Sequence, residues 1–389
     1  EISSMCQNCQ NNQVGNAPYR VDHVGSFLRP KELVEAREKF AKGELSKEEL
    51  TKVEDKVITE LVEKQIANGL KGVTDGEFRR AYWHLDFFWG LNGVEHTQAK
   101  IGYQFHDETT KPDSADVVGK ITGENHPFVE HYKFLRDLVG DRAKVKQTIP
   151  APAQFYFELI RDEEHIAQTY SVYANKEELF ADIIAAYKQV IKEHYDAGCR
   201  IIQLDDCTWG AIVDDKLIKL IAEGSGLEPE GIREAFIKDF ITLNNGILTE
   251  LPEDLVVNTH ICRGNYHSTW ASAGGYDAVA DTLFGEENVN AYYLEYDTDR
   301  AGDFKPLAKV GKDKKVVLGL LTSKSGKLEN KDEVIARIKE ASEYVPLENI
   351  YLSTQCGFAS TEEGNILTEE DQWKKIALIS EIVKEVWGE

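Results

Sequence analysis

The sequence is poor in methionine, proline and basic residues, and it lacks long apolar runs. Only 45 residues are Lys or Arg, against 68 Asp or Glu, so the formal net charge is −23 at pH 7. Nucleic acids and anionic membranes select for basic surfaces, and neither is an expected partner. No apolar stretch approaches the length of a membrane span, and residues 1–17 lack the pattern of a signal peptide. Small-molecule substrates fit this composition better.

Cysteine is also scarce, with 6 in 389 residues, which excludes a disulfide framework. We therefore expect a cytoplasmic protein in which grouped Cys and His bind metal or take part in catalysis. Residues 1–18 are rich in Gln, Asn and Ser, which predicts a flexible N-terminal arm or a leader added by cloning. Cys6 and Cys9 in this arm have no second ligand pair nearby, so we expect no zinc there.

From Tyr19 to Glu389, short strand-like runs alternate with longer stretches of helical period. This pattern predicts a single α/β domain, a (β/α)8 TIM barrel, with an open doubly wound sheet as the alternative fold. An irregular excursion, Glu95–Glu130, is expected between the second and third strands; it is either a lid or a surface decoration. The eight expected strands lie near Arg20–Gly25, Gly69–Thr74, Ala143–Ile149, Arg200–Leu204, Asp254–Thr259, Ala291–Glu295, Lys315–Leu320 and Asn349–Ser353.

Helices are expected between these strands. Ser46 precedes one of them and Glu49 follows three residues later, which predicts a capping box. The expected helices are Ser46–Ala67, Lys176–Ala197, Glu230–Leu248, Gly275–Leu283, Lys331–Tyr344 and Glu369–Val386.

The candidate site residues recur where the expected strands end. In a TIM barrel the loops after the strands build the active face, so polar residues at these points are expected to converge. They are Gly25 and Ser26 after the first strand, Glu77 after the second, Asp205 after the fourth, His260 and Cys262 at the fifth, Glu295 at the sixth and Cys356 after the eighth.

His260 and Cys262 are two residues apart on an expected strand, so their side chains point the same way. With Glu295 and Cys356 they would form a set of one nitrogen, one oxygen and two sulfurs, which zinc accepts. Two interpretations are open on spacing alone: a zinc site at the barrel mouth, or four unconnected residues. Cys207 is near Asp205 in the chain and either packs in the core or lines the site.

Six short motifs together resemble the catalytic barrel of cobalamin-independent methionine synthases. They occur in the order of that family and span nearly all of the chain from Tyr19 onward. They are His23–Pro30, Asp75–Glu77, Gln203–Asp205, Thr259–Cys262, Leu294–Glu295 and Gln355–Gly357.

The resemblance implies a zinc-dependent transferase of methionine biosynthesis, with zinc on His260, Cys262, Glu295 and Cys356. It implies that homocysteine is held by Gly25, Ser26, Glu77 and Asp205. Zinc would convert the homocysteine thiol to the nucleophilic thiolate, and Glu295 is the ligand we expect a thiolate to displace. The expected acceptor and donor are homocysteine and a methylfolate or methyl-corrinoid.

Two departures from the family pattern concern the methyl donor. The acidic pterin contact expected after Asp205 is missing from Asp206–Ala211, and the proton-donating His has no counterpart in Gly319–Ser325, where Lys324 is a possible substitute. Methyl transfer to a thiol is therefore better supported than any one donor. The alternatives are a zinc-dependent transferase or lyase acting on another thiol or coenzyme thiol, a metal-free barrel decarboxylase, and a zinc protein without catalysis.

Overall fold

The computed structural model describes most of the chain. The described residues are 17–99, 104–105, 108–109, 113–262, 275–298, 302–359 and 366–389. Residues 1–16, which hold Cys6, Cys9 and nearly all of the expected N-terminal arm, lie outside these ranges.

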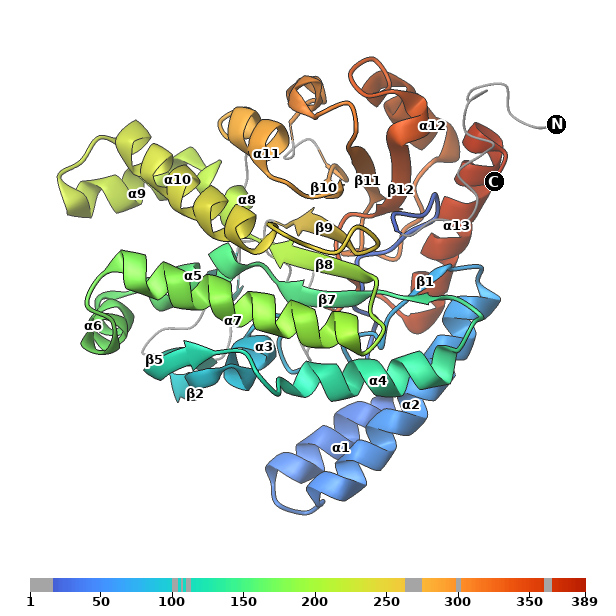
Figure 1. Cartoon of the computed structure of the whole chain (residues 1–389). Coiled ribbons are helices and arrows are strands. Elements are labelled where there is room, and N and C mark those ends of the chain that lie inside the picture. Colours follow the sequence, from blue (N-terminus) through green and yellow to red (C-terminus); the bar gives the residue numbers. More distant parts are fainter. Residues whose placement is uncertain are drawn as a thin grey trace.

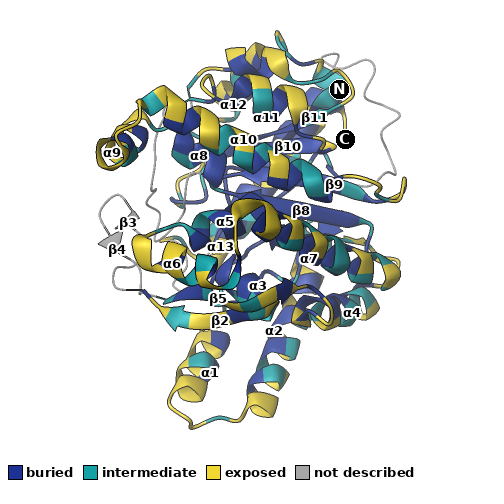
Figure 2. Ribbon diagram, turned by 60° about the vertical axis from the view of Figure 1, so that its left-hand side comes forward, coloured by how far each residue is buried: buried dark blue, intermediate teal, exposed yellow. Residues whose placement is uncertain are grey.

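A six-stranded parallel sheet forms the centre of the molecule (Figure 1). Its strands lie in the order β12-β11-β10-β9-β8-β7, so consecutive strands along the chain are neighbours in the sheet. The strands are almost wholly buried, as expected for parallel strands covered by helices (Figure 2). Their bounds are β7 Gln147–Pro150, β8 Ile201–Asp206, β9 Val256–Ile261, β10 Ala291–Glu295, β11 Lys315–Leu321 and β12 Ile350–Thr354.

Two further segments extend this sheet at its edges. β1 (Gly72–Val73) pairs in parallel with β6 (Lys144–Val145), which leads directly into β7, and Val21 bridges to Leu352 in β12. Between these two edges, a ring nitrogen of His23 lies 2.7 Å from the Gly72 carbonyl oxygen, and the Thr74 hydroxyl donates to the Gly25 carbonyl at 2.6 Å.

The eight segments therefore have the arrangement of a (β/α)8 barrel, and the predicted fold is confirmed over the open doubly wound alternative. Seven of the eight expected strands are found within a few residues of their predicted bounds, and the first, Arg20–Gly25, is represented by the single bridge at Val21. The first strand pairs with β12 through its backbone only near Val21. On its other side it contacts β1 through a side chain, that of His23, and not through a ladder of backbone hydrogen bonds. A buried ion pair, Lys146 to Asp22 at 3.3 Å, and a hydrogen bond from the Tyr293 hydroxyl to Asp22 help to hold this strand in place.

The helices cover the outside of the sheet and expose their outer faces to solvent (Figure 2). None of the described helices is both long enough and apolar enough to cross a bilayer. Their bounds are α1 Lys31–Ala41, α2 Lys47–Ala67, α3 Leu85–Gly90, α4 Pro127–Val139, α5 Pro152–Leu159, α6 Glu163–Val172, α7 Lys176–Asp196, α8 Thr208–Ile212, α9 Asp215–Ser225, α10 Pro229–Ile247, α11 Ala280–Glu286, α12 Lys331–Ala341 and α13 Glu369–Trp387, with 3-10 turns at Lys305–Lys309 and Leu347–Asn349.

Two helix starts differ in detail from the predictions. Ser46 caps α2 through its side-chain oxygen, which accepts the Glu49 N–H at 3.1 Å, but both halves of a capping box are found instead at α13, between Thr368 and Asp371. Helix α11 begins at Ala280 and not at Gly275, because glycine is a poor helix former and the chain turns before it becomes helical.

The excursion between the second and third barrel strands is more regular than predicted. Strands β2 (Asn92–Gln98) and β5 (Asp113–Thr122) pair in antiparallel fashion, and the short strands β3 (Gln104–Phe105) and β4 (Glu108–Thr109) pair with each other. The polar composition concealed an alternating pattern in which one face of β5 buries Ala115 and Val117. The Ser114 hydroxyl donates to Glu158 in α5 at 2.7 Å, which attaches the hairpin to the barrel.

Candidate metal and substrate site

His260 and Cys262 lie at the carboxyl end of β9, in the middle of the sheet. His260 is aligned with Asp205 of β8 on one side and with Tyr293 of β10 on the other. Both side chains are buried, and the Cys262 N–H donates to the Asp206 carbonyl at 2.9 Å, which continues the ladder one residue beyond the strand. The predicted alternation therefore places imidazole and thiol on the same side of β9.

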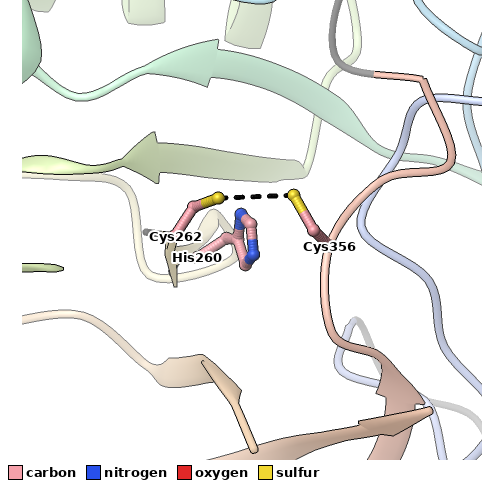
Figure 3. Close-up of side chains that lie close together, drawn as sticks. All are labelled: His260, Cys262 and Cys356. Atoms are coloured by element: carbon pink, nitrogen blue, oxygen red, sulfur yellow. Dashed lines mark hydrogen bonds between the residues drawn. The ribbon is translucent and has the colours of Figure 1, made fainter. Parts of the chain in front are cut away.

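Cys356 brings a second sulfur to this point from the end of β12. Its Sγ lies 3.4 Å from the Sγ of Cys262 (Figure 3). The ligand atoms of His260, Cys262 and Cys356 all lie within 4.8 Å of one another, and all three residues are buried. Two sulfurs bound tetrahedrally to one zinc ion at about 2.3 Å lie roughly 3.8 Å apart, so a small displacement would fit the metal. The donor set suits zinc better than calcium or magnesium.

The His260 ring is held from both sides. Its Nδ1 lies 3.3 Å from an Asp205 oxygen, and its Nε2 lies 3.2 Å from the Gln355 carbonyl oxygen. Burial works against the protonated ring, but the hydrogen bond and charge of Asp205, together with the Gln355 carbonyl, raise the pKa of His260 to about 9. A histidine that binds a metal must be neutral and must turn one nitrogen to the metal, so metal binding at His260 would release a proton.

The two thiols hold their protons in the metal-free protein. A hydrogen bond with Cys207, together with burial and the charge of Glu295, raises the pKa of Cys262. The hydrogen bond with Cys262 and burial raise the pKa of Cys356 in the same way. Thiolates are the metal-binding form, so these sulfurs would become strong ligands only when a cation offsets their charge.

Glu295 does not join the three other predicted ligands. Among the described residues, the cluster within the 4.8 Å limit contains only His260, Cys262 and Cys356. Glu295 ends β10, and one of its carboxylate oxygens lies 3.8 Å from the Lys324 Nζ. Its position at the strand end is as expected, but its carboxylate is paired with a cation.

Lys324 lies beside the cluster in the loop after β11, and its side chain is only 5% exposed. Its Nζ is also 3.7 Å from an oxygen of Asp297. The sequence indicated the position of this lysine near the site but not its two carboxylate partners.

The expected substrate residues surround the same point from the first two strands. The backbone at Gly25 has φ of +137°, and a Cβ there would lie 2.8 Å from the Thr148 side chain, so only glycine fits without strain. A Cβ on Gly357 would lie 1.9 Å from the Ser26 Oγ, so the close packing of these two loops leaves no room for a side chain at this position. The Ser26 Oγ accepts the Ala359 N–H at 3.2 Å.

Glu77 is a buried carboxylate on a strained backbone, with φ of +62°. It accepts a hydrogen bond from the Thr148 hydroxyl at 3.0 Å and lies 3.7 Å from Arg80. Burial raises the pKa of Glu77 to about 7, and the charge of Asp205 adds to this effect while Arg80 opposes it. Ionisation of Glu77 costs free energy while the site is empty, and a bound cationic group would offset that cost.

Six of the eight candidate residues line one pocket with a free volume of about 20 Å³, enough for one water-sized group, and Gly25 and Glu295 are not among its lining residues. A larger cavity of about 550 Å³ lies at the opposite end of the barrel, where residues such as Lys71 and Lys144 precede or begin strands, and it contains none of the candidate residues. The small pocket is lined by Val24, Ser26, Glu77, Trp83, Asp205, Cys207, His260, Cys262, Cys356 and Gly357.

Two lining residues lie outside the six sequence motifs and were not assigned to the site from the sequence. Trp83 belongs to an aromatic run before α3, and such runs usually fill a core. Cys207 was left open between packing and the site; its backbone N–H donates to Gln154, and its thiol shares a hydrogen bond with Cys262. Its position two residues after Asp205 was the signal that could have placed it.

Comparison with known families gives the same assignment as the site geometry. The model of the family described as "Cobalamin-independent synthase, Catalytic domain" matches residues 21–371. The chain belongs to this family. The match covers all of the candidate residues, from Gly25 to Cys356, and confirms the resemblance carried by the six sequence motifs.

Relatives of the chain cover most of its length. It is 47% identical over 372 residues to an uncharacterized Bacillus subtilis protein, YxjH, with 95% of each chain covered. It is 24% identical over 348 residues to a Saccharolobus solfataricus methionine synthase, with 86% of each covered.

Solved structures in the family show the same fold. A Listeria monocytogenes protein provisionally assigned as a vitamin-B12-independent methionine synthase is 38% identical, with a TM-score of 0.74 over 97% of this chain and 100% of that one. A Shewanella B12-independent methionine synthase, solved with selenomethionine, is 20% identical with a TM-score of 0.67, covering 94% and 97% of the chains. The latter likeness concerns the fold alone.

Proposed function

We propose that the protein is a zinc-dependent methyltransferase that moves a methyl group to the thiol of homocysteine and forms methionine. The observation that carries this proposal is the convergence of His260, Cys262 and Cys356 at the mouth of a barrel of the cobalamin-independent synthase family. A buried set of one imidazole and two thiols has the chemistry of a zinc site.

The residues divide between metal and substrate. His260, Cys262 and Cys356 would hold zinc, with Glu295 as a fourth ligand that a substrate sulfur replaces. Bound zinc supplies a positive charge that keeps the substrate sulfur as a thiolate at neutral pH. Asp205 orients the His260 ring through its 3.3 Å contact, and Cys207 supports Cys262.

The substrate amino acid would be held by charge and by backbone groups. Glu77 and Asp205 are the two pocket carboxylates available to its ammonium group. The loop containing Gly25 and Ser26 is available to its carboxylate, through the Ser26 hydroxyl and nearby N–H groups. Fixing both charged groups would orient the sulfur toward the metal ligands and toward a methyl donor.

The methyl donor is a methylfolate, a methyl-corrinoid or a sulfonium compound. Asp206, which follows Asp205, accepts hydrogen bonds from Thr208 and Asn244 and is fully buried, so it is committed to the protein interior. Asp206 therefore does not replace the acidic pterin contact that is missing from this segment, and we propose that the methyl donor is bound through other contacts.

Metal content and a donor screen test the proposal. The purified protein should hold one zinc per chain, the Cys262→Ser and Cys356→Ser variants should lose it, and Cys199→Ser, a buried cysteine away from the pocket, should keep it. With homocysteine, the zinc protein should form methionine from methylcobalamin, methyltetrahydrofolate or S-methylmethionine. Absence of zinc would overturn the proposal, and zinc without methionine from any donor would favour a different thiol acceptor.

A further inference from the structure

Lys324, in the loop after β11, lies between two buried carboxylates at the end of β10 and just beyond it. Its Nζ is 3.8 Å from Glu295, which ends β10, and 3.7 Å from Asp297, two residues farther along. The side chains of the three residues are between 1% and 6% exposed, so water screens their charges little. Within the described part of the chain, neither Asp297 oxygen accepts a hydrogen bond, which leaves the Lys324 charge as its partner.

The Glu295 backbone is fixed by hydrogen bonds, and its carboxylate forms an ion pair with Lys324. The Tyr276 hydroxyl accepts the Glu295 N–H at 3.0 Å and donates to the Glu295 carbonyl at 3.3 Å. One hydroxyl therefore holds both backbone polar groups of this residue. The distance of 3.8 Å between the Glu295 carboxylate and the Lys324 Nζ is that of an ion pair without a direct hydrogen bond.

Lys324 is itself positioned by the loop that precedes it. Its N–H donates to the Thr322 side chain at 3.1 Å, and the Ser323 hydroxyl donates to the Gln355 side chain at 2.9 Å, next to Cys356. The Lys324 charge is also close enough to act on the Cys356 thiol. The ammonium group thus lies beside the proposed metal ligands.

We propose that Lys324 is a positioning residue that receives the Glu295 carboxylate when a substrate thiolate takes its place at the metal. This inference rests on the proposed zinc site. Exchange of one anion for another leaves a second negative charge inside a buried pocket, and a buried charge is costly without a partner. Lys324 supplies that partner, and Asp297 keeps the ammonium paired while Glu295 is away.

A double-mutant cycle on zinc affinity tests this role without any methyl transfer. Lys324 competes with zinc for Glu295, so Lys324→Met should bind zinc about tenfold more tightly than wild type, measured by competition with a chromophoric chelator. In the Glu295→Gln background the same substitution should change zinc affinity less than about twofold. Lys324→Arg, which keeps the charge, should resemble wild type.

An equal effect of Lys324→Met in both backgrounds would overturn the proposal, because Lys324 would then act on the metal as a general nearby charge. Lys327→Met, an exposed lysine in the same loop, is the matched control and should leave zinc affinity unchanged. If Lys324→Met fails to fold with Asp297 unpaired, the Lys324→Met/Asp297→Asn variant removes both charges and should show the same dependence on Glu295.

Cobalt substitution adds a measurement of the exchange itself. Sulfur-to-cobalt absorption on addition of homocysteine should require about tenfold more homocysteine in Lys324→Met than in wild type, because the displaced carboxylate has lost its partner. Equal titrations would contradict the proposal. A wild-type protein that binds no zinc would overturn both the proposed function and this role, whereas zinc binding without methionine formation leaves the cycle as a test of Lys324 alone.

Discussion

The sulfur atoms of Cys262 and Cys356 lie 3.4 Å apart although the residues are 94 positions apart in the chain. A disulfide needs a separation of about 2.05 Å, so a small movement would join them once no metal holds them apart. We expect mild oxidation of the metal-free protein to form this bond, with loss of two titratable thiols. Peptide mass spectrometry measures the linkage.

Zinc loading is the matched comparison for this oxidation. Protein loaded with zinc should resist it, and metal-free Cys199→Ser should still form the bond. Oxidation at the same rate with and without zinc would show that the two thiols are not metal ligands.

Asp205 has two proposed roles, binding the homocysteine ammonium group and orienting His260, that a single substitution can separate. It lies 3.3 Å from His260 and accepts a hydrogen bond from Gln203 at 2.8 Å. Asp205→Asn retains an oxygen for His260 but loses the charge, so we expect homocysteine binding to weaken by about 10- to 100-fold with zinc affinity reduced far less. Calorimetry measures both affinities, and parallel loss of zinc and homocysteine would assign Asp205 mainly to His260.

The pKa of Glu77 predicts a pH dependence of substrate binding. Burial raises this pKa to about 7, with Asp205 and Asp75 adding to the shift and Arg80 and Arg29 opposing it. Below pH 7 the empty site holds a proton that an incoming ammonium group must displace. Homocysteine affinity should therefore fall as pH drops below 7, approaching about tenfold per unit.

The difference between wild type and Glu77→Gln isolates this effect from the titration of the substrate thiol and the metal ligands. The variant should bind homocysteine weakly at all pH values, with the Glu77 part of the slope removed. An unchanged slope in Glu77→Gln would place the ammonium group elsewhere.

Gly25 permits a test of how tightly the loop after the first barrel strand is packed. Gly25→Ala adds a Cβ 2.8 Å from Thr148 at a backbone angle that favours glycine. We expect a loss of about 2–3 kcal/mol in the free energy of unfolding, measured with urea. Gly43→Ala is the control: its φ is +74° but nothing lies within 4 Å of a Cβ, so it should cost only about 1 kcal/mol. Equal losses would show that the Thr148 contact adds nothing.

Most of the fold, and the convergence of His260, Cys262 and Cys356, could be predicted because they depend on local patterns and on barrel topology. The period of two in β9 places His260 and Cys262 on one side, and barrel topology brings the end of β12 to the same face. The β2–β5 hairpin was missed because its polar residues conceal the alternation of Ala115 and Val117.

The remaining features depend on side-chain contacts between distant segments. The pairing of Glu295 with Lys324 joins the ends of two strands, and no sequence period predicts which way a carboxylate turns. Trp83 lines the pocket, but it belongs to a run of aromatic residues, and the sequence does not indicate which of them does so. The two contacts of Asp205 likewise depend on where β8 and β9 align.

The location of the ligands also sets the order of events during biosynthesis. His260 and Cys262 come from β9 and Cys356 from the end of β12, and β10 and β11 lie between them. The chain must fold past residue 356 and align four strands before the three ligand atoms meet. At the proposed zinc site, metal insertion would therefore be a late step in a nearly folded protein, and zinc would not nucleate folding as it does in a zinc finger.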